Sequence, residues 1–154
     1  MDPRPVYLLL HVLCVVIWVG GMFFAYACLR PVAATVLDAA ARLRLWVGVF
    51  SRFFPLVWIC VGLLLGSGLA MIQQLGFAIA PLHWHLMFGL GLLMMAVFGH
   101  VFFAPWQRLK LAVDLEDWPG GARALAQIRR LVGVNLTLGM VTIAMATIGR
   151  WLSV

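Results

Sequence analysis

The chain has 154 residues, of which 65% are hydrophobic and only 10% are charged, and its formal net charge is +6. A soluble domain of this size cannot bury so much apolar surface, so the composition excludes an ordinary soluble protein. Long uninterrupted apolar runs also differ from the weak alternation of a membrane β-barrel. We therefore expect an all-α, four-helix transmembrane bundle that forms a single integral membrane domain over residues 1–154.

Four apolar segments, each long enough to cross a bilayer at about 20 residues, make up this bundle. They cover residues 6–29, 46–73, 82–104 and 131–152. Pro55 lies inside the second segment and predicts either a kink or a helix that begins in the preceding turn. We expect the first segment to be retained, because its apolar run is too long for a signal peptide.

Lysine and arginine are unevenly distributed among the connections between these segments. The second connection, residues 73–84, has none. Because cytoplasmic connections carry an excess of basic residues, we expect the first and third connections to be cytoplasmic and both termini to be periplasmic. This rule explains the net positive charge of the chain, so nucleic acid is not expected as a partner. Nine of the 11 basic residues lie in or beside the first and third connections: Arg30, Arg42, Arg44, Arg52, Arg108, Lys110, Arg123, Arg129 and Arg130.

Both basic connections contain segments with helical patterns. Residues 33–45 are alanine-rich, and residues 122–130 form a basic amphipathic lead-in to the last helix. We expect both to be surface helices at headgroup level. Between the third and fourth spans, Trp118-Pro-Gly-Gly121 predicts a turn.

Glycines recur within the apolar segments, and small residues allow helix backbones to approach closely. Gly20-Gly21 and Gly66-Ser-Gly68 could equally make room for a flat cofactor. The positions expected at helix contacts are Gly62, Gly66, Gly89, Gly91, Gly133 and Gly139.

Histidines near the outer end of the bundle are the candidate ligands, because an ionisable side chain inside hydrocarbon usually marks a site. His11 lies about 7 Å inside the first segment by the helical rise. His83 and His85 open the third segment on the same side, and Arg150 closes the fourth there. Facing imidazoles in a helix bundle can hold haem iron, and an arginine can pair with haem propionates.

Copper is the alternative ligand, because histidine, cysteine and methionine side chains suit it. The pair His83 and His85 could hold a divalent ion at the surface. A third interpretation is that the histidines are polar residues satisfied by local hydrogen bonds. Cys14 shares a helix face with His11. We nevertheless expect Cys14, Cys28 and Cys60 to be small buried hydrophobic residues.

A second polar group is expected at the inner end. Arg52, His100 and Asn135 fall at a similar depth, and a lone charge there needs partners. We expect the three to approach one another, unless Arg52 instead extends to the lipid headgroups.

These motifs resemble the copper resistance D (CopD) family of small membrane proteins and, more distantly, the HemJ-type protoporphyrinogen oxidases. The residues that carry the resemblance are His11-x6-Trp18-x-Gly-Gly21-Met-Phe-Phe, Leu29-Arg30-Pro31, Arg52 with Pro55, and Val134-Asn135-Leu-x-Leu-Gly139.

The HemJ resemblance implies haem b with His11 as an axial ligand. In that family the third helix opens with a Trp-x-His-x-Lys-like pattern, and Met87 stands here at the lysine position. A thioether can also ligate haem iron. The CopD resemblance implies copper handling at the bacterial inner membrane.

We therefore expect a multi-pass haem b-binding redox protein with an unidentified redox partner. His11 is the expected first ligand and His85 the second, with Met87 or His83 as substitutes for His85. Copper transport or resistance is the alternative function. A protoporphyrinogen oxidase-like enzyme, with its porphyrin substrate at the inner polar group, is a further one. A homo-oligomer is compatible with the sequence.

Overall fold

The computed structural model describes residues 3–76 and 79–149, so Arg150 lies outside the described residues. Within these ranges the chain is helical and has no strand, which confirms the all-α bundle. Four helical segments there are long and apolar enough to span a membrane. The elements are α1 (Arg4–Phe24), η1 (Ala25–Leu29), α2 (Arg30–Val36), α3 (Ala39–Leu75), α4 (Leu82–Phe103), α5 (Pro105–Asp114) and α6 (Trp118–Ile148).

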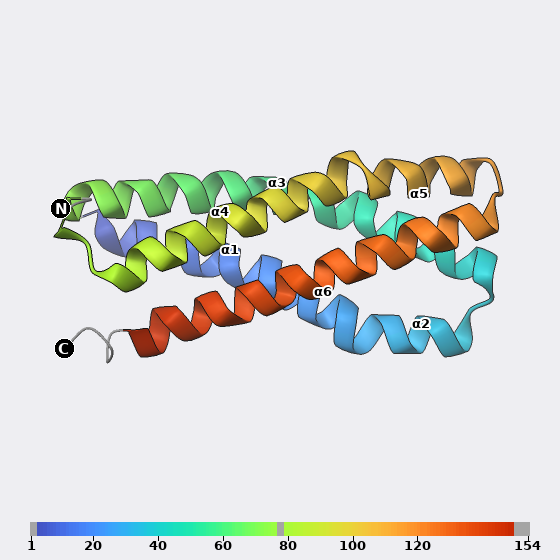
Figure 1. Cartoon of the computed structure of the whole chain (residues 1–154), viewed down its shortest axis with the longest axis horizontal. Helices are drawn as coiled ribbons and strands as arrows, with labels where there is room; N and C mark the ends of the chain where they lie inside the picture. Colours follow the sequence, from blue (N-terminus) through green and yellow to red (C-terminus); the bar gives the residue numbers. More distant parts are fainter. Residues whose placement is uncertain (1–2, 77–78, 150–154) are drawn as a thin grey trace.

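The bundle is elongated (Figure 1), and its two ends carry different kinds of residue. The histidine end holds the start of α1, the α3–α4 connection and the end of α6. The basic end holds α2, the start of α3, α5 and the start of α6. Along this length α1 packs mainly on α3, while α4 and α5 pack mainly on α6.

The first helical segment continues past the boundary that the sequence predicts at residue 29. Pro31 has no backbone N–H and would clash with the carbonyl one turn earlier in a regular helix. The chain accommodates it with the wider π-turn of η1, in which the Arg30 N–H donates to the Ala25 carbonyl. The prediction of a separate surface helix over residues 33–45 is therefore wrong, because residues 30–36 extend the first span and α3 begins at Ala39.

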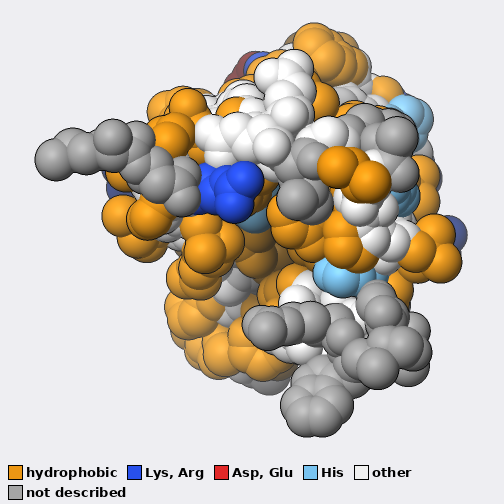
Figure 2. All heavy atoms as spheres, turned by 90° about the vertical axis from the view of Figure 1, so that its left-hand side faces the viewer, with side chains coloured by type: hydrophobic (Ala, Val, Ile, Leu, Met, Phe, Trp, Pro, Cys, Tyr) orange, Lys and Arg blue, Asp and Glu red, His pale blue; other side chains and the backbone are white. Residues whose placement is uncertain are grey.

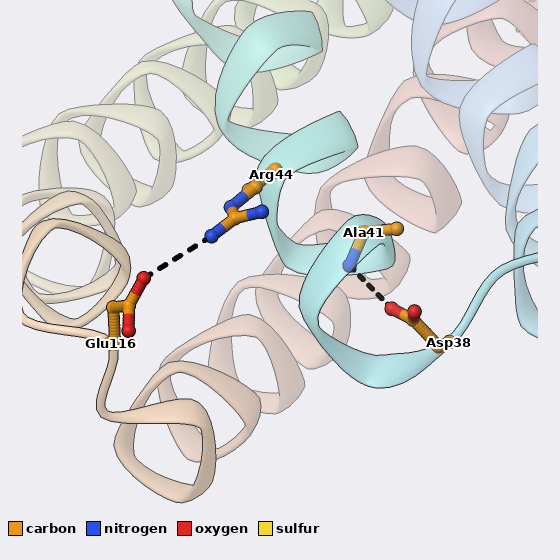
Figure 3. A network of polar contacts seen from close by, with 4 residues as sticks. All are labelled: Asp38, Ala41, Arg44 and Glu116. Atoms are coloured by element: carbon orange, nitrogen blue, oxygen red, sulfur yellow. Dashed lines mark hydrogen bonds and ion pairs between the residues drawn. The ribbon is translucent and has the colours of Figure 1, made fainter.

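Two aspartates begin the helices that start at the basic end. The Asp38 carboxylate accepts from the Ala41 N–H at 2.7 Å and caps α3 (Figure 3). Asp117 accepts from the Gly120 N–H at 2.9 Å and caps α6. The predicted turn at residues 118–121 is therefore wrong. This segment is the first turn of α6, where the proline is well tolerated, and residues 122–130 continue the same helix.

Helix α3 runs without interruption through Pro55, so the alternative of a helix start at that point is excluded. The helix ends at Gly76, whose φ of 93° is a left-handed conformation that side chains other than glycine rarely adopt. The Gly76 N–H donates to the Ile72 carbonyl at 2.9 Å and closes the last turn.

The glycines divide into two groups that the sequence does not separate. A Cβ atom added at Gly139 would lie 3.0 Å from Val19 and 3.2 Å from Met94, so α6 approaches α1 and α4 closely there. Gly133 likewise packs against Tyr26. The prediction of close helix contacts is wrong within the chain for Gly62, Gly66, Gly89 and Gly91, since a Cβ atom on any of them would meet nothing within 4 Å.

Which end faces the cytoplasm remains a prediction from the distribution of charge. A reporter fused after Val154, or within residues 74–81, is expected to be active in the periplasm. A reporter placed within residues 112–121 is expected to be active in the cytoplasm. Paired alkaline phosphatase and fluorescent-protein fusions measure both, and cytoplasmic activity of the fusion after Val154 would contradict the assignment.

Candidate functional site

His11 lies at the contact between α1 and α3, near the histidine end. Its Nδ1 atom is 3.0 Å from the Ser67 hydroxyl oxygen. The Ser67 hydroxyl in turn lies 2.6 Å from the Leu63 carbonyl oxygen. Gly68 leaves room for the imidazole, since a Cβ atom there would lie 3.5 Å from His11 Cε1. The imidazole is therefore held by α3.

This pair of contacts fixes the tautomer of His11. A serine hydroxyl has a single hydrogen, and the carbonyl of Leu63 can only accept. Ser67 therefore donates to Leu63, and its oxygen accepts from the Nδ1–H of His11. A neutral imidazole in this tautomer keeps a lone pair on Nε2, which is the arrangement found in histidines that bind metals.

Two buried cysteines meet one turn further into the same contact. Cys14 on α1 and Cys60 on α3 are 4% and 3% exposed, belong to the same buried core cluster, and have thiols that are near neighbours. Both are free thiols. The contact between α1 and α3 therefore contains two thiols, with the His11 imidazole one helical turn away on the same face of α1.

Sequence reasoning recognised that His11 and Cys14 share a face but treated the cysteines as packing residues. The sequence did not show that Cys60 lies beside Cys14. Cys60 lies seven residues, or two helical turns, before Ser67 on α3, so the two share one face. The signal in the sequence is that each of the two helices has a cysteine and a polar residue on the same face: Cys14 with His11 on α1, and Cys60 with Ser67 on α3.

The other predicted ligands lie on α4, which packs mainly on α6. The His85 Nδ1–H donates to the Pro81 carbonyl at 3.3 Å, within its own helix start. His83 packs against Gly149 near the end of α6, and Met87 is half-buried. The structure thus places His11 against α3 and the α4 histidines beside other partners. Histidine side chains reach the surface of this end (Figure 2).

The expected inner group does not form a hydrogen-bonded cluster. Asn135 is 3% exposed, and its amide donates to the Met22 sulfur at 3.8 Å. Arg52 and His100 both have exposed side chains. An exposed position near the end of the apolar stretch lets each reach the headgroup region without a partner inside the bundle.

Asn135 faces a cavity of about 250 Å³ whose other walls are apolar and aromatic, including Trp18, Phe53 and Phe98. The Asn135 Oδ1 atom is buried and has no hydrogen-bond partner among the described residues. An unpaired buried acceptor is unfavourable by about 1–3 kcal/mol. Residues of α1 and α3 line this cavity, but His11, Cys14 and Cys60 do not, so it is separate from the part of the α1–α3 contact that holds them.

Within the described ranges, no three His, Cys, Asp or Glu side chains come together as a metal site. The thiols of Cys14 and Cys60 remain as a two-sulfur group. Such a pair suits a metal of low coordination number that prefers soft ligands, and Cu(I) is the common metal of this kind.

Comparison with known proteins gives one family. The model described as "Copper resistance protein D" matches residues 47–148, about two-thirds of the chain. Neither the curated proteins nor the solved structures contain a match. The matched range includes Cys60 and Ser67 but not Cys14 or His11.

Proposed function

We propose a copper-handling function, on the premise that this chain belongs to the copper resistance protein D family. The observation that supports the proposal is the buried contact of Cys14 with Cys60, one turn from His11. Thiolate sulfur selects Cu(I) over harder ions. Imidazole is a common copper ligand, and the Ser67 hydrogen bond leaves the His11 Nε2 atom able to act as one.

The apolar surroundings restrict the charge that this site can hold. A Cu(I) ion bound by one thiolate forms a neutral unit, whereas two thiolates would leave a net negative charge among apolar side chains. We therefore assign one cysteine as thiolate and the other as a neutral thiol donor. Binding of each Cu(I) ion then releases one thiol proton.

The position of the site suggests the side from which copper arrives. His11 lies between the thiols and the histidine end, where imidazoles reach the surface (Figure 2). We assign His83 and His85 to first contact with the ion at that surface. The ion would then pass to His11 and on to Cys14 and Cys60, so the chain would bind copper from the side of its second connection.

The test is a titration of the full chain, purified in a neutral detergent under reducing, oxygen-free conditions. Cu(I) is supplied from a coloured chelator, which reports the amount transferred. We expect one Cu(I) ion per chain, about one proton released for each ion, and X-ray absorption dominated by sulfur neighbours. A chain that takes no Cu(I) from the chelator would contradict the proposal.

Haem b is the second candidate ligand. It is supported by the same observation, that the hydrogen bond to Ser67 leaves the His11 Nε2 atom able to bind a metal. It requires a ligand from another helix, for which His85 remains the first choice and Met87 or His83 the substitutes. The two candidates differ in one measurement on protein from haem-replete cells, the visible spectrum. An intense Soret band that His11→Ala abolishes would establish the haem site. A colourless protein that retains copper would exclude it.

A further inference from the structure

A second cavity, of about 560 Å³, lies at the basic end between the α1–α2 segment, α3 and α6. Three arginines line it, each from a different helix: Arg30, Arg42 and Arg129. The remaining wall is mainly apolar and includes Trp46 and Leu125. The volume is within the usual range of about 300–1,000 Å³ for ligand pockets.

The charges on these arginines are not neutralised by the described part of the chain. At the same end, Arg44 pairs with Glu116 at 3.4 Å (Figure 3). The nearest acidic residue in sequence to Arg42 is Asp38, whose carboxylate caps α3 instead. No ion pair or side-chain hydrogen bond joins Arg30, Arg42 or Arg129 to any described residue. The cavity thus gathers three positive charges without a counter-ion.

Two aromatic residues place the cavity at the edge of the bilayer. The Arg30 guanidinium stacks over the Tyr26 ring, with 5.0 Å between its central carbon and the ring centroid. Trp46 also lines the cavity. Tyrosine and tryptophan are enriched at the depth of the lipid headgroups, where their rings are apolar and their polar atoms meet water.

We propose that this cavity binds an anionic phospholipid, with its phosphate held by Arg30, Arg42 and Arg129 and its glycerol and upper acyl chain against the apolar wall. Guanidinium groups pair strongly with phosphate oxygens. Basic pockets between helices at the cytoplasmic side are a recurring way to hold anionic headgroups. The inference does not depend on copper, because none of these residues lies near Cys14 or Cys60.

The experiment compares lipid binding to the full chain by native mass spectrometry from a neutral detergent. Phosphatidylglycerol is added, with phosphatidylcholine as the uncharged reference and inorganic phosphate as a soluble competitor. We expect bound phosphatidylglycerol that millimolar phosphate does not displace, and much weaker retention of phosphatidylcholine. Equal retention of both lipids would overturn the proposal, as would displacement by phosphate, which would indicate a site for a free anion.

The variant R30Q/R129Q tests the cavity itself, and R123Q/R130Q is its control. Both remove two positive charges, but Arg123 and Arg130 are exposed and lie outside the cavity. A basic residue near an anionic surface contributes about fivefold to binding, so R30Q/R129Q should lower phosphatidylglycerol affinity by roughly 25-fold. R123Q/R130Q should change it by no more than about threefold. Equal losses in the two variants, at unchanged thermal stability, would show general attraction to charge and refute the site.

Discussion

Cys60→Ser is expected to lower the affinity of the protein for Cu(I) by roughly 100-fold or more. Changes to the outer partners of a metal ligand already weaken binding by about 10–100-fold, and this change removes a sulfur that would contact the ion. Serine keeps the size of the side chain but replaces a soft donor by a hard one, which Cu(I) binds poorly. Cys14→Ser should have a similar effect, because the two thiols form one group.

Cys28→Ser is the matched control. Cys28 is the third cysteine of the chain, and the expectation that it is buried is wrong: it is exposed and lies in η1, away from the contact between α1 and α3. Competition against a Cu(I) chelator should therefore give the wild-type affinity for this variant. If all three single variants weakened binding equally, the ion would not be bound specifically by Cys14 and Cys60.

Gly139→Leu is expected to destabilise the bundle by about 3 kcal/mol, at the upper end of the usual range for overpacking. Gly139 is buried where α6 meets Val19 of α1 and Met94 of α4, and a single added carbon already lies 3.0 Å from Val19. Both neighbours belong to the core. A leucine therefore requires α6 to move away from both helices, which thermal unfolding in detergent would register as a lower midpoint.

Gly66→Leu makes the same chemical change on α3, at a position where an added Cβ atom meets nothing within 4 Å. Its stability should be unchanged or higher by up to about 1 kcal/mol, since leucine favours a helix more than glycine does. A loss equal to that of Gly139→Leu would contradict the separation of the two glycine groups, and would indicate that this face of α3 packs against a second copy.

The sequence was sufficient for the class of fold and for the four spanning segments. Hydrophobicity is a property of each segment, so length and composition identify a span without knowledge of its neighbours. The boundaries of the individual helices were less predictable. Arg30 and Pro31 indicated a helix end, but the π-turn of η1 carries the helix past the proline. Pro119 and its glycines suggested a turn, but capping by Asp117 makes them the start of α6.

The candidate site was predicted only in part, because pairing between helices depends on rotation about the helix axis. His11 was identified as a site residue because an ionisable side chain in hydrocarbon is energetically unfavourable, and this can be judged without knowing which residues surround it. Its contact with Ser67 and the meeting of Cys14 with Cys60 required the pairing of α1 with α3. Likewise, the spacing of Gly62 and Gly66 resembles a packing motif, yet both face outward.

The length of the helices has a consequence for how deeply the protein lies in a membrane. The spanning segments contain between 31 and 36 residues, and a helix of that length extends roughly 46–54 Å. A hydrocarbon core is only about 30 Å thick, so the bundle exceeds it even in a thick membrane. Helix length therefore does not determine the vertical position of the protein. That position is set by charge, because Arg52, Arg108 and Arg130 must remain among the headgroups and hold the uncharged part of the bundle in the lipid.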